Sequence, residues 1–197
     1  MTPLAYQPPG NESDRLMNTR PLRIGLLVLL YVCFGVSLFV SASLLPERVA
    51  THFNGAGQAD GWMSRGTHLT FMAAFGVVFP LFLIGVCWAI RFLPASLVNI
   101  PHRDYWLADE RRAESASYLA WHAVWFGCLA LSFVIGLHWL IVFSNQRQPP
   151  SLPIAWVLGV IVPFLLGVAA WVYCLYRRFR VEGPDHRKAG VSLAEPS

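Results

Sequence analysis

The chain has 197 residues, of which 55% are hydrophobic and only 13% are charged. A soluble domain carries about 25% charged residues, so this composition and the mean hydropathy of +0.48 argue against a water-soluble globule. The formal net charge is +4, but no nucleic-acid-binding motif accompanies it. We therefore attribute the basic excess to membrane topology and to contact with anionic lipid.

Four long apolar runs predict four transmembrane helices. Each run lacks Asp, Glu, Lys and Arg and reaches the roughly 20 residues that a helix needs to cross the hydrocarbon core. The runs cover residues 24–45, 67–90, 118–143 and 152–176. The predicted fold class is all-α: a four-helix membrane domain at residues 19–181, between flexible tails at residues 1–18 and 182–197.

The distribution of basic residues predicts the orientation of these helices. Lys and Arg in short loops stay on the cytoplasmic side of a membrane. They gather before the first run, between the second and third, and after the fourth. The other two loops hold only Arg48, Arg65 and Arg147. We therefore expect both termini, with their tails, and the middle loop in the cytoplasm, and the first and last loops outside.

The first run carries signals for its ends and for its packing. Thr19 is expected to cap the helix, with Pro21 in its first turn, and Pro46 is expected to end it. Cys33, Ser37 and Ser41 follow one another at intervals of four residues. Small residues at this spacing predict a face that points into the bundle.

The outer loop, residues 45–66, is long for a connection between helices. Residues 49–53 are expected to be extended, with positive-φ turns at Asn54-Gly55 and Gly57 and a further turn at Asp60-Gly61. Polar residues with defined turns at a membrane surface favour contact with a ligand. The alternative is a compact loop that packs on itself and binds nothing. The candidate binding residues are His52, Asn54, Asp60, Trp62 and Arg65.

The middle loop, which follows the second run, holds a second motif. Pro101 is expected to hold the chain extended, and residues 108–117 to form a helix that continues into the third run. Aromatic and charged side chains then favour a charge-paired collar at the inner membrane interface, where Arg and Asp or Glu pair. The motif residues are Asn99, Pro101, Tyr105, Trp106, Arg111 and Arg112.

Two features stand out within the third and fourth runs. His122 lies about one turn inside the third run, and we expect it to hydrogen-bond Ser117 or another helix. Gly159, Pro163 and Gly167 recur every four residues in the fourth run, which predicts a second close-packing face.

Both loops resemble an uncharacterised bacterial membrane domain that is found at the N-terminus of SdpI-type toxin-immunity proteins. The resemblance implies a multi-pass protein of the bacterial inner membrane, in a family with no agreed activity. The immunity proteins themselves are longer and have further spans, and the family often has Lys where Arg65 stands. The matching residues are Leu45-Pro46, His52-Phe53-Asn54, Gly57, Asp60-Gly61-Trp62 and Arg65, then Asn99-Ile100-Pro101, Tyr105-Trp106-Leu107 and Arg111-Arg112.

A small metal-dependent hydrolase is one alternative function. Imidazoles and a carboxylate can bind zinc and leave a position for a nucleophilic water. No local ligand spacing supports such a site, so we expect no cofactor and retain zinc as the alternative. The candidate ligands, all near the outer face in the predicted topology, are His52, Asp60, His68 and His138. The simpler interpretation is that His52 hydrogen-bonds the backbone of its own turn.

We expect a binding or sensing protein rather than an enzyme. Its outer loop would engage a peptide, a toxin, a lipid or a partner membrane protein, and nucleic acid is not an expected partner. The absence of Asp and Glu from all four runs argues against a proton-coupled or sodium-coupled transporter. A structural or assembly subunit of a membrane complex is the other alternative.

Overall fold

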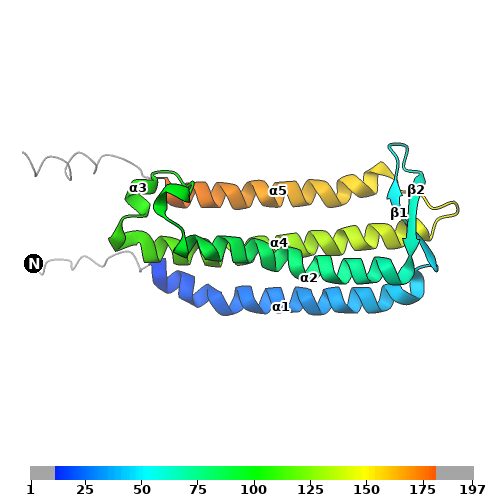
Figure 1. The fold of residues 1–197 in the computed structure, drawn as a ribbon, viewed down its shortest axis with the longest axis horizontal. Helices are drawn as coiled ribbons and strands as arrows, with labels where there is room; N and C mark the ends of the chain where they lie inside the picture. The colour runs from blue at the N-terminus through cyan, green and yellow to red at the C-terminus, as the bar shows by residue number, and fades with distance from the viewer. Residues whose placement is uncertain (1–11, 181–197) are drawn as a thin grey trace, which may run out of the picture.

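Four long helices run side by side in the computed structural model, which describes residues 12–180 (Figure 1). They are α1 (Glu12–Leu44), α2 (Arg65–Ala89), α4 (Asp109–Asn145) and α5 (Ile154–Phe179). The shorter elements are strands β1 (Arg48–Phe53) and β2 (Ala59–Ser64), 3-10 helices η1 (Ile90–Phe92) and η2 (Ala95–Leu97), and helix α3 (Arg103–Trp106). The predicted tails at residues 1–11 and 181–197 lie outside the described residues.

All four long helices are long and apolar enough to cross a membrane, which confirms the four predicted spans. Their outer faces carry large apolar side chains that are mostly exposed; Phe39 is 83% exposed and Leu166 is 65% exposed. Apolar surface of this extent requires hydrocarbon around it, and helices satisfy their own backbone hydrogen bonds there. The protein is therefore a multi-pass membrane protein.

Helix α4 is the centre of the bundle. It packs against α1, α2 and α5, whereas α5 makes its main contact with α4 (Figure 1). The expected hydrogen bond from His122 to another helix is confirmed: its Nε2 lies 3.1 Å from the carbonyl oxygen of Trp171 on α5. Between α1 and α2, Gly76 permits close approach, because a Cβ there would lie 2.3 Å from the Phe34 ring.

The start of α1 differs from the prediction. The helix begins at Glu12, so Thr19 is an interior residue and not the cap. Its hydroxyl oxygen accepts a hydrogen bond of 2.9 Å from Arg23. The segment before Thr19 is rich in good helix formers, and Pro21 removes only one backbone hydrogen bond. The helix therefore extends through a segment that polarity alone assigned to a tail.

The predicted small-residue faces are only partly buried. Ser37 and Ser41 are 9% and 0% exposed, but Cys33 is exposed. On α5, Gly167 packs closely on Leu129, whereas Gly159 has open space beside it. An α-helix has 3.6 residues per turn, so residues four apart drift by about 40° each time. Three successive members therefore do not share one contact.

Candidate functional site

Strands β1 and β2 form an antiparallel hairpin between α1 and α2, which confirms the predicted extended segment. The expected turn at Asp60-Gly61 is wrong, because both residues lie inside β2. Gly61 is opposite His52, where the register is irregular, and a Cβ on Gly61 would lie 2.7 Å from the His52 Cβ. Glycine is needed here for close approach of two strands and not for a turn.

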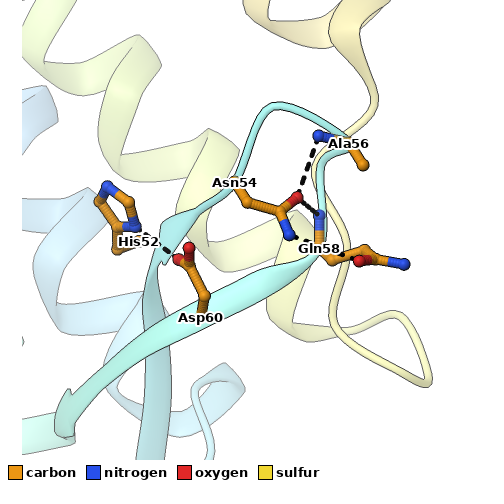
Figure 2. A network of polar contacts seen from close by, with 5 residues as sticks. All are labelled: His52, Asn54, Ala56, Gln58 and Asp60. Atoms are coloured by element: carbon orange, nitrogen blue, oxygen red, sulfur yellow. Dashed lines mark hydrogen bonds and ion pairs between the residues drawn. The ribbon is translucent and has the colours of Figure 1, made fainter.

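The turn of the hairpin is built by Asn54. Its side-chain oxygen accepts hydrogen bonds of 3.0 Å from the backbone N–H groups of Ala56 and Gln58 (Figure 2). Positive φ is confirmed at Gly57, where it is 75°, but Gly55 does not adopt it. Asn54, a predicted binding residue, therefore shapes the turn, since an Asn side chain readily bonds its own backbone a few residues on.

His52 and Asp60 form a side-chain pair across the two strands. Their Nδ1 and Oδ1 atoms are 2.5 Å apart (Figure 2). His52 therefore bonds a carboxylate and not the backbone of its own turn. Both side chains are solvent-accessible, at 74% and 44% exposed. With Nδ1–H donated to the carboxylate, a neutral imidazole presents Nε2 as a hydrogen-bond acceptor.

Two side chains fasten the hairpin to the bundle. The Asn145 amide at the end of α4 accepts a 2.8 Å bond from the backbone N–H of Ala50 and donates a 2.8 Å bond to its carbonyl. Arg65, a predicted binding residue, donates to the carbonyl oxygen of Leu45 at 3.1 Å and so closes the base of the hairpin. The sequence reasoning missed Asn145; its only signal was an amide at the end of an apolar run.

The tip of the hairpin is held by the loop between α4 and α5. The backbone N–H of Leu152 donates to the carbonyl of Gly57 at 2.8 Å, and Gln58 forms an isolated bridge with Ser151. Trp62 remains 41% exposed on β2, with the Arg48 guanidinium 5.7 Å from its ring centroid. The hairpin is thus a fixed cap on this end of the bundle, with His52, Asp60 and Trp62 accessible on it.

A cavity of about 460 Å³ lies beneath the hairpin. Its polar side chains are those of Thr51, His52 and His68, and the rest of its wall is apolar. The apolar wall consists of Met63, Phe71, Met72, Leu137, Leu140, Ile141, Leu152 and Val157. The hairpin, α2, α4 and α5 all contribute, so the cavity exists only when the hairpin is docked.

The four candidate zinc ligands form two separate pairs. His68 and His138 stack inside the bundle with ring centroids 5.5 Å apart, and they are 3% and 0% exposed. His138 Nε2 lies 2.7 Å from the Ser41 hydroxyl. Within residues 12–180, no group of three or more His, Cys, Asp or Glu side chains is placed to hold a metal ion. In the part of the chain that the structure describes, the four candidates are therefore not brought together as one zinc site.

Residues 27–77 match a family described as Domain of unknown function (DUF1648). The matched segment runs from α1 through the hairpin into α2, so it contains every candidate of the outer loop. A comparison with curated proteins found no match, and a comparison with solved structures also found none.

The middle-loop motif ties α5 and the connecting loop to α4. Trp106 Nε1 donates to the carbonyl of Phe179 at 2.9 Å, and the Trp106 carbonyl accepts a 2.8 Å bond from Ser115. Tyr105 packs edge-to-face on Trp106 at 5.1 Å. These contacts close the end of the bundle that lies opposite the hairpin (Figure 1).

Among the ion pairs of the described residues, none joins Arg111 or Arg112 to the neighbouring Asp109 or Glu110, contrary to the expectation. Arg112 donates to the carbonyl of Leu93 at 2.5 Å, and Arg111 donates to that of Tyr105 at 3.4 Å. The last carbonyl groups of a helix lack partners within it, so those at the ends of η1 and α3 are available as hydrogen-bond acceptors for these Arg side chains. An ion pair with an exposed carboxylate stabilises little in comparison. Asn99 is exposed and Pro101 is half-buried. The Asn99 side chain makes no hydrogen bond to another described residue.

Proposed function

We propose that this membrane protein is a binding or sensing protein that recognises its ligand with the outer hairpin and the cavity beneath it. The observation that carries the proposal is the position of this cavity, between the hairpin and the ends of α2, α4 and α5, with His52 in its wall. Cavities of roughly 300–1,000 Å³ with apolar walls and a few polar groups are typical of ligand sites.

The lining defines the class of ligand. Its apolar wall fits an acyl chain or the apolar side chains of a membrane-active peptide, and His52 offers a hydrogen bond to a polar part of the same ligand. An immunity-like role follows if the ligand is a peptide toxin. The proposal includes a location in the bacterial inner membrane, kinship with SdpI-type proteins, and lipid, a peptide or another membrane protein as partners.

The other two functions are not proposed. A hydrolase lacks support because His52 and Asp60 contact each other on the hairpin, whereas the other two candidate ligands, His68 and His138, form a separate pair inside the bundle. An assembly subunit would need a partner surface, and the apolar faces of α1 and α5 are equally suited to lipid.

Site-specific photo-crosslinking tests the proposal. A photoreactive phenylalanine analogue at Thr51, in the cavity wall, should give a discrete adduct by mass spectrometry in membranes of the native host. The same analogue at Phe39, which faces away from the bundle, should give only diffuse lipid adducts.

A matched pair of substitutions on α5 serves as the control. Val157→Phe fills the cavity and should abolish the adduct, whereas Val162→Phe, on the exposed side of the same helix, should leave it unchanged. An adduct that survives Val157→Phe, or identical adducts from Thr51 and Phe39, would contradict the proposed function.

A further inference from the structure

A second site lies at the end of the bundle opposite the hairpin. Two adjoining cavities, of about 450 and 400 Å³, share Arg91 and Ser117 in their walls. The larger one also reaches Arg112 and Asp109 at the start of α4. The smaller one lies against α1, α2 and α4 and reaches Arg20. Neither cavity involves the hairpin, so this site is independent of the proposed outer site.

Positive charge dominates the joint wall. Among the described lining residues, Arg20, Arg91 and Arg112 are accompanied by one carboxylate, that of Asp109, and Arg112 also donates to the carbonyl of Leu93. Among the side chains that the structure describes, neither Arg20 nor Arg91 has a hydrogen-bond acceptor, and Arg20 Nε is buried without a partner. Arg23, on the same helix as Arg20, is only 8% exposed and adds to the positive potential. Guanidinium groups held without acceptors are poised to bind an anion.

Tryptophan side chains fix two of these guanidinium groups in place. Arg91 lies over the ring of Trp88 with its Cζ 4.2 Å from the centroid, and Arg20 lies over Trp121 at 4.9 Å. Stacking on an aromatic face restricts an Arg side chain while leaving its N–H groups free for a planar or tetrahedral anion. Trp side chains are also enriched at the depth of lipid head groups.

The smaller cavity changes from charged to apolar along its length. Ile84 on α2 precedes Arg91, in the adjoining η1, by seven residues, and on α4 Val124 follows Ser117 by seven. A seven-residue step is about 10 Å along a helix. The two helices are antiparallel, so Ile84 and Val124 lie at the same, deeper end. The wall therefore suits a molecule with an anionic head and an apolar chain.

We propose that these joined cavities bind an anionic phospholipid. Its phosphate lies among Arg20, Arg91 and Arg112, and one acyl chain follows Ile84 and Val124. Arg recognises phosphate through several parallel N–H···O bonds, and basic cavities between transmembrane helices on the cytoplasmic side are known to take lipid head groups. Ser117 supplies one further hydroxyl donor.

Native mass spectrometry of the full chain in detergent, titrated with phosphatidylglycerol or phosphatidylcholine, tests this assignment. The wild-type protein should retain phosphatidylglycerol at concentrations at least about tenfold lower than phosphatidylcholine. Both lipids carry the phosphate, but the choline ammonium of phosphatidylcholine would place a positive charge beside the three guanidinium groups. The double variant Arg20→Gln/Arg91→Gln should lose that preference. Inorganic phosphate at millimolar concentration should not displace the lipid, because it lacks the chain.

Arg177→Gln is the matched control. Arg177 is also near that end of the bundle and also lies over an aromatic ring, that of Tyr173 at 5.8 Å, but it is outside both cavities. This variant should keep the preference. The single variant Arg91→Gln, at an exposed side chain, should weaken it even if the double variant does not fold. Equal retention of both lipids by the wild type, an equal loss in Arg177→Gln, or displacement by inorganic phosphate would overturn the proposal.

Discussion

Asn145 links the hairpin to the bundle through one side-chain amide. Beside its two bonds to Ala50, it donates to the carbonyl of Ile141 at 2.8 Å within α4. Ala50 is fully buried, so no water can replace the amide. The strand β1 is therefore held at the depth that forms the cavity wall, and the geometry of Thr51 and His52 depends on this residue.

Replacement of Asn145 by Ala should destabilise this end of the molecule. It leaves the N–H and carbonyl of Ala50 without partners, and each unpaired buried group costs about 1–3 kcal/mol. We expect a lower midpoint of thermal unfolding in detergent and faster hydrogen exchange in β1. Gln146→Ala, at the exposed neighbouring residue, is the control and should change neither quantity.

The pair of His52 and Asp60 should matter little for stability. Exposed ion pairs contribute about 0–1 kcal/mol, and both side chains are accessible to solvent. Asp60→Ala should therefore leave the free energy of unfolding within about 1 kcal/mol of the wild type. It should nonetheless weaken the crosslinked adduct from Thr51, because the His52 ring loses its orientation. A destabilisation as large as that of Asn145→Ala would assign the pair a structural role instead.

Sequence reasoning identified His52 and Asp60 but not what they do. Their residue types and the turn signals around them marked a polar loop, and the contact between them depends on the strand register. Asn54 and Arg65 were selected for binding, yet Asn54 bonds the backbone of the hairpin turn and Arg65 bonds the carbonyl of Leu45 before the hairpin. Polar side chains in short loops are often needed by the loop itself, and sequence alone does not separate the two uses.

The hairpin is the element on which the outer site depends. At its tip, Gly57 combines a φ of 75° with a backbone carbonyl bonded by Leu152, and a Cβ there would lie 2.4 Å from the Leu152 oxygen. A side chain at this position meets both the left-handed backbone and the loop between α4 and α5. Undocking of the tip would open the cavity beneath.

Gly57→Ala should therefore loosen the hairpin from the α4–α5 loop. The left-handed conformation alone costs about 1–2 kcal/mol for a residue with a Cβ. Hydrogen exchange at the amide of Leu152 should rise, and the adduct from Thr51 should fall. Gly55→Ala is the control, since a Cβ at Gly55 meets nothing within 4 Å and its φ is not positive. Equal effects of both substitutions would show that the tip is not docked.

The elements were more predictable than their contacts. Apolar length predicted the four helices, and β-branched and aromatic residues predicted the extended segment at 49–53. The position of β2 was missed because Asp60-Gly61 has the composition of a turn. In the structure Gly61 lies opposite His52, where the register is irregular and the two strands approach closely. The separation of His68 and His138 from the hairpin depends on helix packing that no local pattern encodes.

At the scale of the whole molecule, the two proposed sites lie at opposite ends of one bundle. The hairpin caps one end, and α3 lies at the other, near the basic cavities (Figure 1). The central position of α4 joins them, since its end at the hairpin holds Asn145 and Ser117 lies near its opposite end. Nothing in the sequence indicated that the third span would be central, because all four runs are similarly apolar.

The orientation of this bundle in the membrane is the claim on which both proposals depend. Single cysteines at Gly55 on the hairpin tip and at Asp104 in the middle loop, treated with a membrane-impermeant maleimide on intact cells, measure it directly. The side chain of Asp104 is 95% exposed, and the four native cysteines all lie in the spanning helices, so the wild-type chain gives the background. We predict that Gly55→Cys is labelled on intact cells and that Asp104→Cys is labelled only after permeabilisation. Labelling in the reverse order, or of both positions from outside, would contradict the account.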